Sequence, residues 1–319
     1  MKNKIKYNLK SSEKYGWTPK WFGEDSFSIE LISKIIDFQK EHNLSADGLV
    51  GPSTYRRIEA SLLSSQDYIP PKRYKRKGKK RIIYNNIEYP IKWDKVILWN
   101  ERGGFSHKKG CFNDWSEKPN RNPIQFVNHW DAALSSESCA KIINKRGLSM
   151  HFLIDNDGTI YQTLDLQHVA WQAGSRVHNI NSIGVEISNA FYLKYQSWYE
   201  RKGFGSRPIE KDHKLNDRKI ENHLGFYDIQ LEALAALWAA IHNATSIELN
   251  ICDVKGYCNE CATGKHAGFI NHFNLTRNKI DCASLDMKKV LGKAQENLEE
   301  LNSFGDDTKD IDSKVTSKA

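Results

Sequence analysis

Residues 268–282 read GFINHFNLTRNKIDC and place a histidine, a lysine and an aspartate in one short segment. Far upstream, the stretch FVNHW places His129 at the end of an apolar run that is typical of a buried strand. His129, His272 and Asp281 can together supply three metal ligands and leave one coordination position open. An open position is the mark of a catalytic rather than a structural zinc site. Lys279, two residues before the aspartate, can stabilise a developing oxyanion.

Composition places the chain among globular proteins. Of its 319 residues 39% are hydrophobic and nine are Trp, which supports a real core and excludes wholesale disorder. Residues 1–10 carry charge but no apolar core of a signal peptide, so we expect synthesis in the cytoplasm without a secretory signal. No run approaches the ~18 apolar residues that a membrane crossing needs. Six cysteines in such a chain favour reduced or metal-bound thiols over disulfides.

The positive charge is concentrated in one segment. The net charge is +8, and residues 66–81 hold eight Lys or Arg against one Asp. We predict a basic linker over 64–83, which either attracts an anionic polymer such as wall teichoic acid, lipid headgroups or nucleic acid, or is a solvated spacer. Because the rest of the chain is close to neutral, we expect no specific nucleic-acid partner.

The first 63 residues predict a small all-α domain. Isoleucines recur at helical spacing over residues 28–43, an Asp-Gly turn follows at 47–48, and Pro52 stands where a second helix begins. The phrase from Phe38 to Tyr55 resembles the peptidoglycan-binding domain found on many cell-wall hydrolases. The alternative is a generic helical hairpin in which these Gly and Pro residues only make turns.

Residues 84–302 predict a second, mixed α/β domain. Strands are expected over 96–99, 124–129, 149–154, 159–162 and 182–187, and helices over 137–145 and 228–243. The Asn-Asp-Gly at 156–158 predicts a hairpin. Residues 192–221 have weak periodicity and much charge, which indicates a long insertion, and residues 303–319 predict a disordered acidic tail.

Five phrases, in order along residues 95–292, resemble the zinc-dependent N-acetylmuramoyl-L-alanine amidase family, which includes peptidoglycan-recognition proteins and phage lysozymes of the amidase type. They are NHW at 128–130, SMHFLI and DGTIYQ within 149–162, VAWQAG at 169–174, NSIGVE at 181–186, and the segment 268–282. The resemblance implies a central mixed β-sheet flanked by helices, one zinc site, and hydrolysis of the amide between N-acetylmuramic acid and L-alanine.

The resemblance also implies roles for individual residues. His129 and His272 match the first two zinc ligands, and Asp281 matches the third, with Cys282 as the alternative because a thiolate also binds zinc well. Glu186 matches the acid that takes a proton from zinc-bound water and returns it to the leaving amine. Lys279 matches the lysine that faces the scissile carbonyl.

Four further residues are expected to contact substrate in this family: Trp130, His151, Trp171 and Gln172. His151 could instead have a purely structural role. Many relatives carry His where this chain has Gln172. A glutamine can hydrogen-bond a carbonyl but cannot carry protons, so the departure argues against a catalytic role at this position.

A second cluster contains Cys252, Cys258, Cys261 and His266. The two-residue gap between Cys258 and Cys261 is common at structural zinc sites, and the other two residues could complete four ligands. The alternative is a set of reduced thiols or a redox pair.

These observations favour a cell-wall hydrolase of the endolysin kind, released by a phage or carried in a virion, which binds peptidoglycan and acts as a monomer. A wall-binding module would raise the local concentration of the enzyme on an insoluble polymer. The alternative is a non-catalytic peptidoglycan-binding protein with the same fold, against which the combined presence of His129, Glu186, His272, Lys279 and Asp281 argues.

Overall fold

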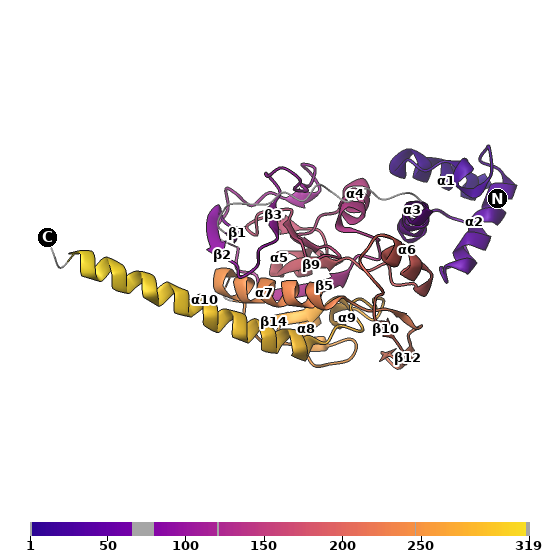
Figure 1. Cartoon of the computed structure of the whole chain (residues 1–319). Helices are drawn as coiled ribbons and strands as arrows, with labels where there is room; N and C mark the ends of the chain where they lie inside the picture. The colour runs from indigo at the N-terminus through magenta and orange to yellow at the C-terminus, as the bar shows by residue number, and fades with distance from the viewer. Residues whose placement is uncertain (1, 66–79, 120, 246, 317–319) are drawn as a thin grey trace.

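A six-stranded mixed sheet forms the centre of the molecule (Figure 1). The structure, a computed structural model, describes residues 2–65, 80–119, 121–245 and 247–316. The strands follow the order β14 (Gly268–Asn271), β5 (Gln125–Trp130), β9 (Ser182–Ile187), β6 (Phe152–Ile154), β7 (Ile160–Gln162) and β3 (Val96–Leu98). The first four run parallel, β7 pairs antiparallel with β6, and β3 is parallel to β7. The predicted α/β class with a mixed sheet is confirmed.

Alternation along the strands separates two apolar layers. On β5, Phe126 belongs to the large cluster around α7, whereas Val127 belongs to a smaller cluster on the other face. Phe269 and Ile270 divide in the same way on β14. Because successive side chains point to opposite faces of a strand, the residues in step with Val127 share its face, and these include His129.

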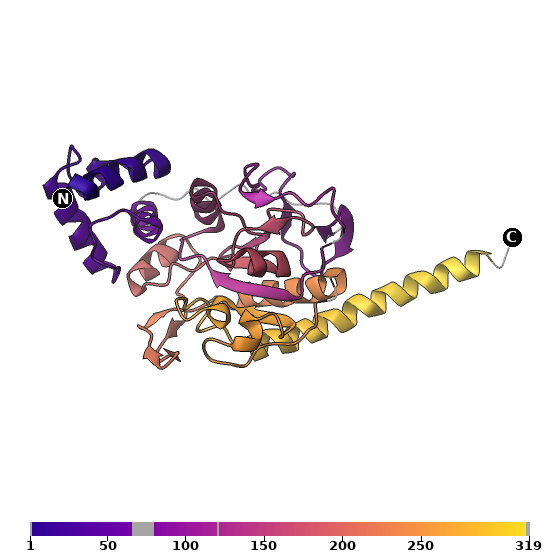
Figure 2. The same ribbon diagram turned by 180° about the vertical axis from the view of Figure 1, so that it is seen from behind.

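Helices cover both faces (Figures 1 and 2). On one face lie α7 (Asp228–Thr245) and α10 (Met287–Thr316), which pack on each other, and on the other lies α4 (Ser136–Arg146). Ser135 caps α4 by accepting a hydrogen bond from the Ser138 N–H, and Gly147 ends it at a φ of 69°. Three short helices of the same domain are α5 (Arg176–Asn181), α8 (Asn259–Ala262) and α9 (His272–Leu275).

The N-terminal region is helical, as predicted, with α1 (Lys2–Tyr15), η1 (Pro19–Phe22), α2 (Ile29–Glu41) and α3 (Pro52–Ser65). Gln39 explains part of its sequence phrase, because its side-chain amide accepts from the Gly48 N–H at 2.8 Å and donates to the Leu49 carbonyl at 3.0 Å. These helices share one apolar cluster with α4 and strands β6 and β7. The predicted linker lies largely outside the described residues, since 66–79 are not among them.

The insertion predicted at residues 192–221 contains helices and short strands and packs against α3. It contains η2 (Leu193–Tyr195), α6 (Gln196–Arg201), β10 (Ile209–Glu210), β11 (Lys214–Leu215), β12 (Arg218–Lys219) and, just beyond it, β13 (His223–Leu224). Tyr195, Trp198 and Tyr199 pack with Ala60 of α3 in one cluster. Arg57 also stacks on the Tyr192 ring at 4.3 Å, so the insertion and the N-terminal helices are joined.

Four short strands complete the described fold: β1 (Arg81–Tyr84), β2 (Ile87–Pro90), β4 (Phe112–Asn113) and β8 (Val169–Ala170). At the C-terminal end α10 projects from the body and continues to Thr316, where the sequence favoured a disordered tail from 303 (Figure 1). No proline interrupts this stretch, so its backbone can continue the helix. No helix among the described residues combines the length and apolar character that a membrane crossing requires.

Candidate metal centre and active site

Two neighbouring parallel strands bring the candidate histidines together. Asn128 of β5 lies opposite Asn271 of β14, so His129 and His272, the next residues, reach the same edge of the sheet. His272 is the first residue of α9, whose start is closed by hydrogen bonds between Asn271 and Asn274. The two imidazole rings lie with centroids 4.3 Å apart. Strand register thus joins residues that are distant in the sequence.

Asp281 completes the group. Its Oδ2 lies 3.1 Å from His129 Nδ1 and 2.9 Å from His272 Nδ1. Burial alone would raise the pKa of Asp281, but the charge on His272 and the hydrogen bonds from both imidazoles hold this pKa well below its usual range. The three ligand atoms lie within 4.8 Å of one another, as a metal site requires.

Cys282, the alternative third ligand, lies elsewhere. It is fully buried in the apolar cluster beneath α7 and α10, and it is not part of the His129, His272 and Asp281 group. Burial raises the pKa of the Cys282 thiol well above its ordinary value, which disfavours the thiolate that binds metals. The geometry therefore favours Asp281 over Cys282.

Gln172 holds the ring of His129. Ser182 Oγ donates to the His178 carbonyl at 2.7 Å, so it must accept from Gln172 Nε2, also at 2.7 Å. The amide oxygen Oε1 of Gln172 therefore points toward His129 Nε2, which lies 2.6 Å away. An amide oxygen only accepts, so Nε2 carries a hydrogen, and in the neutral ring of His129 the lone pair is then on Nδ1, facing Asp281.

Gly184 makes room for this arrangement. A Cβ on Gly184 would come within 2.7 Å of Gln172 Cδ and 2.9 Å of Met150 Sδ. Any larger residue would therefore displace the Gln172 amide that holds His129.

The sequence analysis grouped Gln172 with the substrate-binding residues. In the structure both the oxygen and the nitrogen of its amide contact protein atoms.

Glu186 lies on β9, directly opposite His129 and opposite Leu153 of β6. Residues in register on parallel strands point to the same face, so this carboxyl shares the face of the metal-ligand group. Its Oε2 is buried and has no hydrogen-bond partner among the described residues. Burial raises the pKa of Glu186 to about 7, and the charge on His129 partly offsets that effect. Such a carboxyl can both accept and return a proton near neutral pH.

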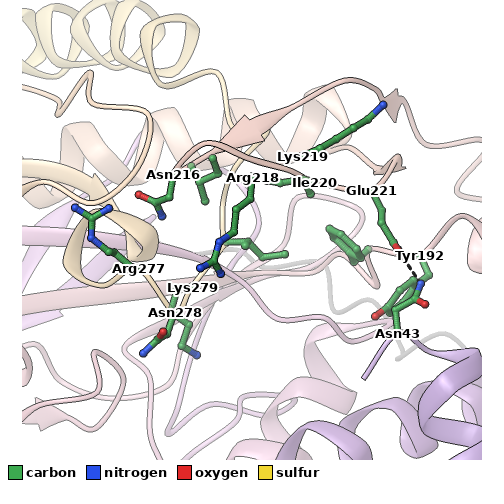
Figure 3. A pocket seen from close by; sticks show the side chains of 13 residues that line it. Asn43, Tyr192, Asn216, Arg218, Lys219, Ile220, Glu221, Arg277, Asn278 and Lys279 are labelled. Carbon is green, nitrogen blue, oxygen red and sulfur yellow. Dashed lines mark hydrogen bonds between the residues drawn. The ribbon is translucent and has the colours of Figure 1, made fainter. Parts of the chain in front are cut away.

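Lys279 is exposed on the loop between α9 and Asp281, where it lines a pocket of about 440 Å³ (Figure 3). The opposite wall comes from the insertion, from which Arg218 extends toward this loop, and Arg277 adds a third cation. Asn43 of the N-terminal region closes one end through hydrogen bonds to Glu221 at 2.8 and 2.9 Å. Sequence reasoning missed the pocket, although the dense charge of the insertion was a signal.

The other predicted contact residues take different places. Trp130 is buried on the opposite face from His129, where it packs against Phe191, because adjacent residues of a strand face opposite ways.

His151 is fully buried. Its Nδ1 accepts a hydrogen bond from the Gly184 N–H, and its Nε2 donates to the His168 carbonyl. Burial holds the pKa of His151 well below its usual range. Trp171 is half-buried, and its Nε1 donates to Asn113 Oδ1.

Of the second predicted cluster, the structure brings three members together. The sulfur atoms of Cys252, Cys258 and Cys261 lie within 4.8 Å of one another and are buried. The imidazole of His266 is not in that group, and its Nε2 is a buried atom without a hydrogen-bond partner among the described residues.

Comparison with known proteins gives a family for the central part of the chain. The family model described as N-acetylmuramoyl-L-alanine amidase matches residues 119–273, which include His129, Gln172, Glu186 and His272 but end before Asp281. This central part of the chain is thus similar to the N-acetylmuramoyl-L-alanine amidase family. No curated relative matches the sequence.

Several solved structures resemble the chain. The catalytic domain of XlyA is 15% identical with a TM-score of 0.37, covering 62% of this chain and 98% of its own. The endolysin amidase LysCS from Clostridium intestinale URNW is 16% identical with a TM-score of 0.36, covering 63% and 95%. AmpD is 18% identical with a TM-score of 0.34, covering 60% and 93%.

Proposed function

We propose that this protein is a zinc-dependent amidase that hydrolyses the bond between N-acetylmuramic acid and L-alanine in peptidoglycan. The observation that carries the proposal is the convergence of His129, His272 and Asp281 at the ends of β5 and β14, in a chain whose residues 119–273 match the amidase family. These residues would hold the zinc ion.

The donor set fits a cation. The contact from Gln172 fixes a hydrogen of His129 on Nε2, so Nδ1 of the neutral ring presents a lone pair to Asp281 Oδ2 at 3.1 Å. Two acceptors at this distance repel each other unless a proton or a metal ion lies between them. Two imidazole nitrogens and one carboxylate form the ligand set of catalytic zinc, which leaves a fourth position for solvent or substrate.

When bound, zinc supplies a Lewis acid and lowers the pKa of a coordinated water to ~7. Glu186, on the neighbouring strand and the same face, is then the group that accepts the proton of the attacking water and donates it to the leaving nitrogen. Its unpartnered Oε2 and its pKa of about 7 suit both steps. Lys279 would stabilise negative charge on the scissile carbonyl.

The cationic pocket beside Lys279 is the proposed binding place of the peptide stem. Arg218, Arg277 and Lys279 surround it, and stem peptides of peptidoglycan carry carboxylates that such cations bind. The N-terminal helices would add wall affinity beside the same pocket, since Asn43 forms part of its lining. We further propose an endolysin-like role, in which the chain acts on the cell wall of a bacterium.

The decisive experiment is mass analysis of purified sacculi digested by the zinc-loaded full chain. The proposal expects new free L-alanine amino groups without new reducing sugars, and no such release by His272→Ala. New reducing ends would identify a glycosidase instead. Binding to sacculi without any release would support the alternative of a non-catalytic peptidoglycan-binding protein.

A further inference from the structure

Three buried cysteines converge away from the proposed catalytic group. Their sulfur atoms lie within 4.8 Å of one another. Four thiolates around a tetrahedral zinc ion, with Zn–S bonds of ~2.3 Å, have sulfurs ~3.8 Å apart, so the observed grouping needs little movement to bind an ion. Val127, Ala173, Ile270 and Leu275 surround these cysteines in one apolar cluster.

The main chain holds these cysteines in place. The Cys252 N–H donates to the Phe269 carbonyl at 3.2 Å, and the Cys258 N–H donates to the Asn274 carbonyl at 3.0 Å. Gln125 of β5 donates from Nε2 to the carbonyls of Cys261 and His266, both at 2.9 Å. The grouping is therefore held by contacts with β5, β14 and α9.

We propose that Cys252, Cys258 and Cys261 bind a second, structural zinc ion, with His266 as the fourth ligand. Gln125 already anchors the backbone of His266 beside that of Cys261. The imidazole Nε2 is buried without a partner among the described residues, and a rotation of the ring toward the sulfurs would satisfy it. Three thiolates and one imidazole form a closed site, which is the arrangement of structural zinc.

A disulfide explains the geometry less well. It would pair two of the three sulfurs and leave the third buried beside it without a role. Cys258 is the N-cap of α8 and Cys261 lies within its single turn, and a two-residue gap between thiolates is typical of zinc ligands.

An ion bound by the cysteines would stabilise the position of α9, the short helix that begins with His272. Asn274, two residues further along α9, donates from Nδ2 to the carbonyls of Val254 and Gly256, both at 2.9 Å. Those carbonyls lie between Cys252 and Cys258 in the chain, so an ion bound by the cysteines would fix the loop against which α9 rests. The cysteines are thus positioning residues for His272, and the proposal does not depend on which reaction the chain catalyses.

The test is a metal count on full-length protein purified without chelators and loaded with zinc. We expect roughly two equivalents per chain, one for each ligand set. The double variant Cys258→Ser/Cys261→Ser and the variant His129→Ala should each lose one equivalent, and Cys111→Ser, which changes a buried free cysteine outside the cluster, should lose none.

X-ray absorption on the His129→Ala protein gives a readout that requires no change to the cysteines. A shell of sulfur scatterers at ~2.3 Å is the expected result. His266→Ala should keep the sulfur shell and lose its imidazole component. A shell without sulfur, or a disulfide between any two of the three cysteines in the natively purified protein, would overturn the proposal.

Discussion

The two candidate metal sites share a sheet face and are both buried, but they differ in the ligands they offer. His129, His272 and Asp281 stand at the strand ends, next to the exposed Lys279 loop and its pocket. The cysteine cluster lies further back against Val127 and Ile270. Two imidazoles and one carboxylate leave one coordination position vacant, whereas three thiolates and one imidazole fill all four, so we call the first group the open site and the second the closed site.

The two sites also differ in whether a titratable carboxyl lies on the same face beside them. Glu186, a buried carboxyl with one unpartnered oxygen, shares the face of the open site. The cysteine cluster is enclosed by apolar side chains. A site that must move protons needs a titrating group nearby, while a site that only holds a loop does not. Changes at the open site should therefore affect turnover, and changes at the cysteines should affect folding.

The largest effect is expected from the metal ligands. His129→Ala should lower kcat/KM on sacculi by about 10³ or more, because loss of the metal removes several kcal/mol of transition-state stabilisation. Turnover assays with saturating zinc check this result. His242→Ala, which changes a histidine on α7 bound to the Ile247 carbonyl, is the matched control and should stay near wild type. Full activity of His129→Ala would remove the open site from the mechanism.

Glu186→Gln should lower kcat by about 10²–10⁴, the range of general acid–base catalysis. In the wild type the rate should fall as the pH drops through about 7, because Glu186 then gains a proton and can no longer accept one. The variant should lack this acidic limb. A pH–rate profile with an unchanged limb in Glu186→Gln would assign the titration to another group and leave Glu186 without its proposed role.

Gln172→Leu should weaken zinc binding at the open site by about 10–100-fold, since it removes the acceptor that orients the His129 ring. Competition with a chromophoric chelator measures the affinity, and Gln172→Glu, which keeps an acceptor, should recover most of it. Zinc at the cysteines should be unaffected. Equal weakening at both sites would point to a general loss of structure.

The smallest effect is expected at the pocket. Arg218→Ala should raise KM for peptide-bearing fragments a few-fold at constant kcat, because a partly exposed charge pair contributes up to ~1 kcal/mol. Lys141→Ala, which removes an exposed cation on α4, is the control. Steady-state kinetics separates the two parameters. A drop in kcat alone would mean that Arg218 acts on the reacting bond and does not serve peptide binding.

Elements with strong local patterns could be predicted from the sequence. The strand at 182–187 and the helix at 228–243 match β9 and α7 within two residues, because side-chain alternation and helical periodicity are local properties. The Asn-Asp-Gly signal likewise marks the β6–β7 hairpin, where Gly158 has a φ of 77°. The three residues proposed to bind zinc were predicted from short phrases that resemble the amidase family.

Contacts between distant segments could not be predicted. The pocket joins Asn43, the insertion and the Lys279 loop, and no periodicity links them. Trp130 was expected to contact substrate from the resemblance to the amidase family, yet it faces the opposite layer from His129, because adjacent strand positions face opposite ways. The docking of the N-terminal helices on the insertion likewise depends on tertiary contacts such as Arg57 on Tyr192.

By itself the sequence determined which residue types stand at the ends of the apolar strands, because hydrophobic periodicity is a property of neighbours in the chain. Only the tertiary structure decided that Asp281, rather than Cys282, faces both imidazoles, and that Gln172 fixes the hydrogen of His129. Those choices depend on strand register and on a chain of donors and acceptors from four separate segments. Such geometry exists only once the sheet has formed.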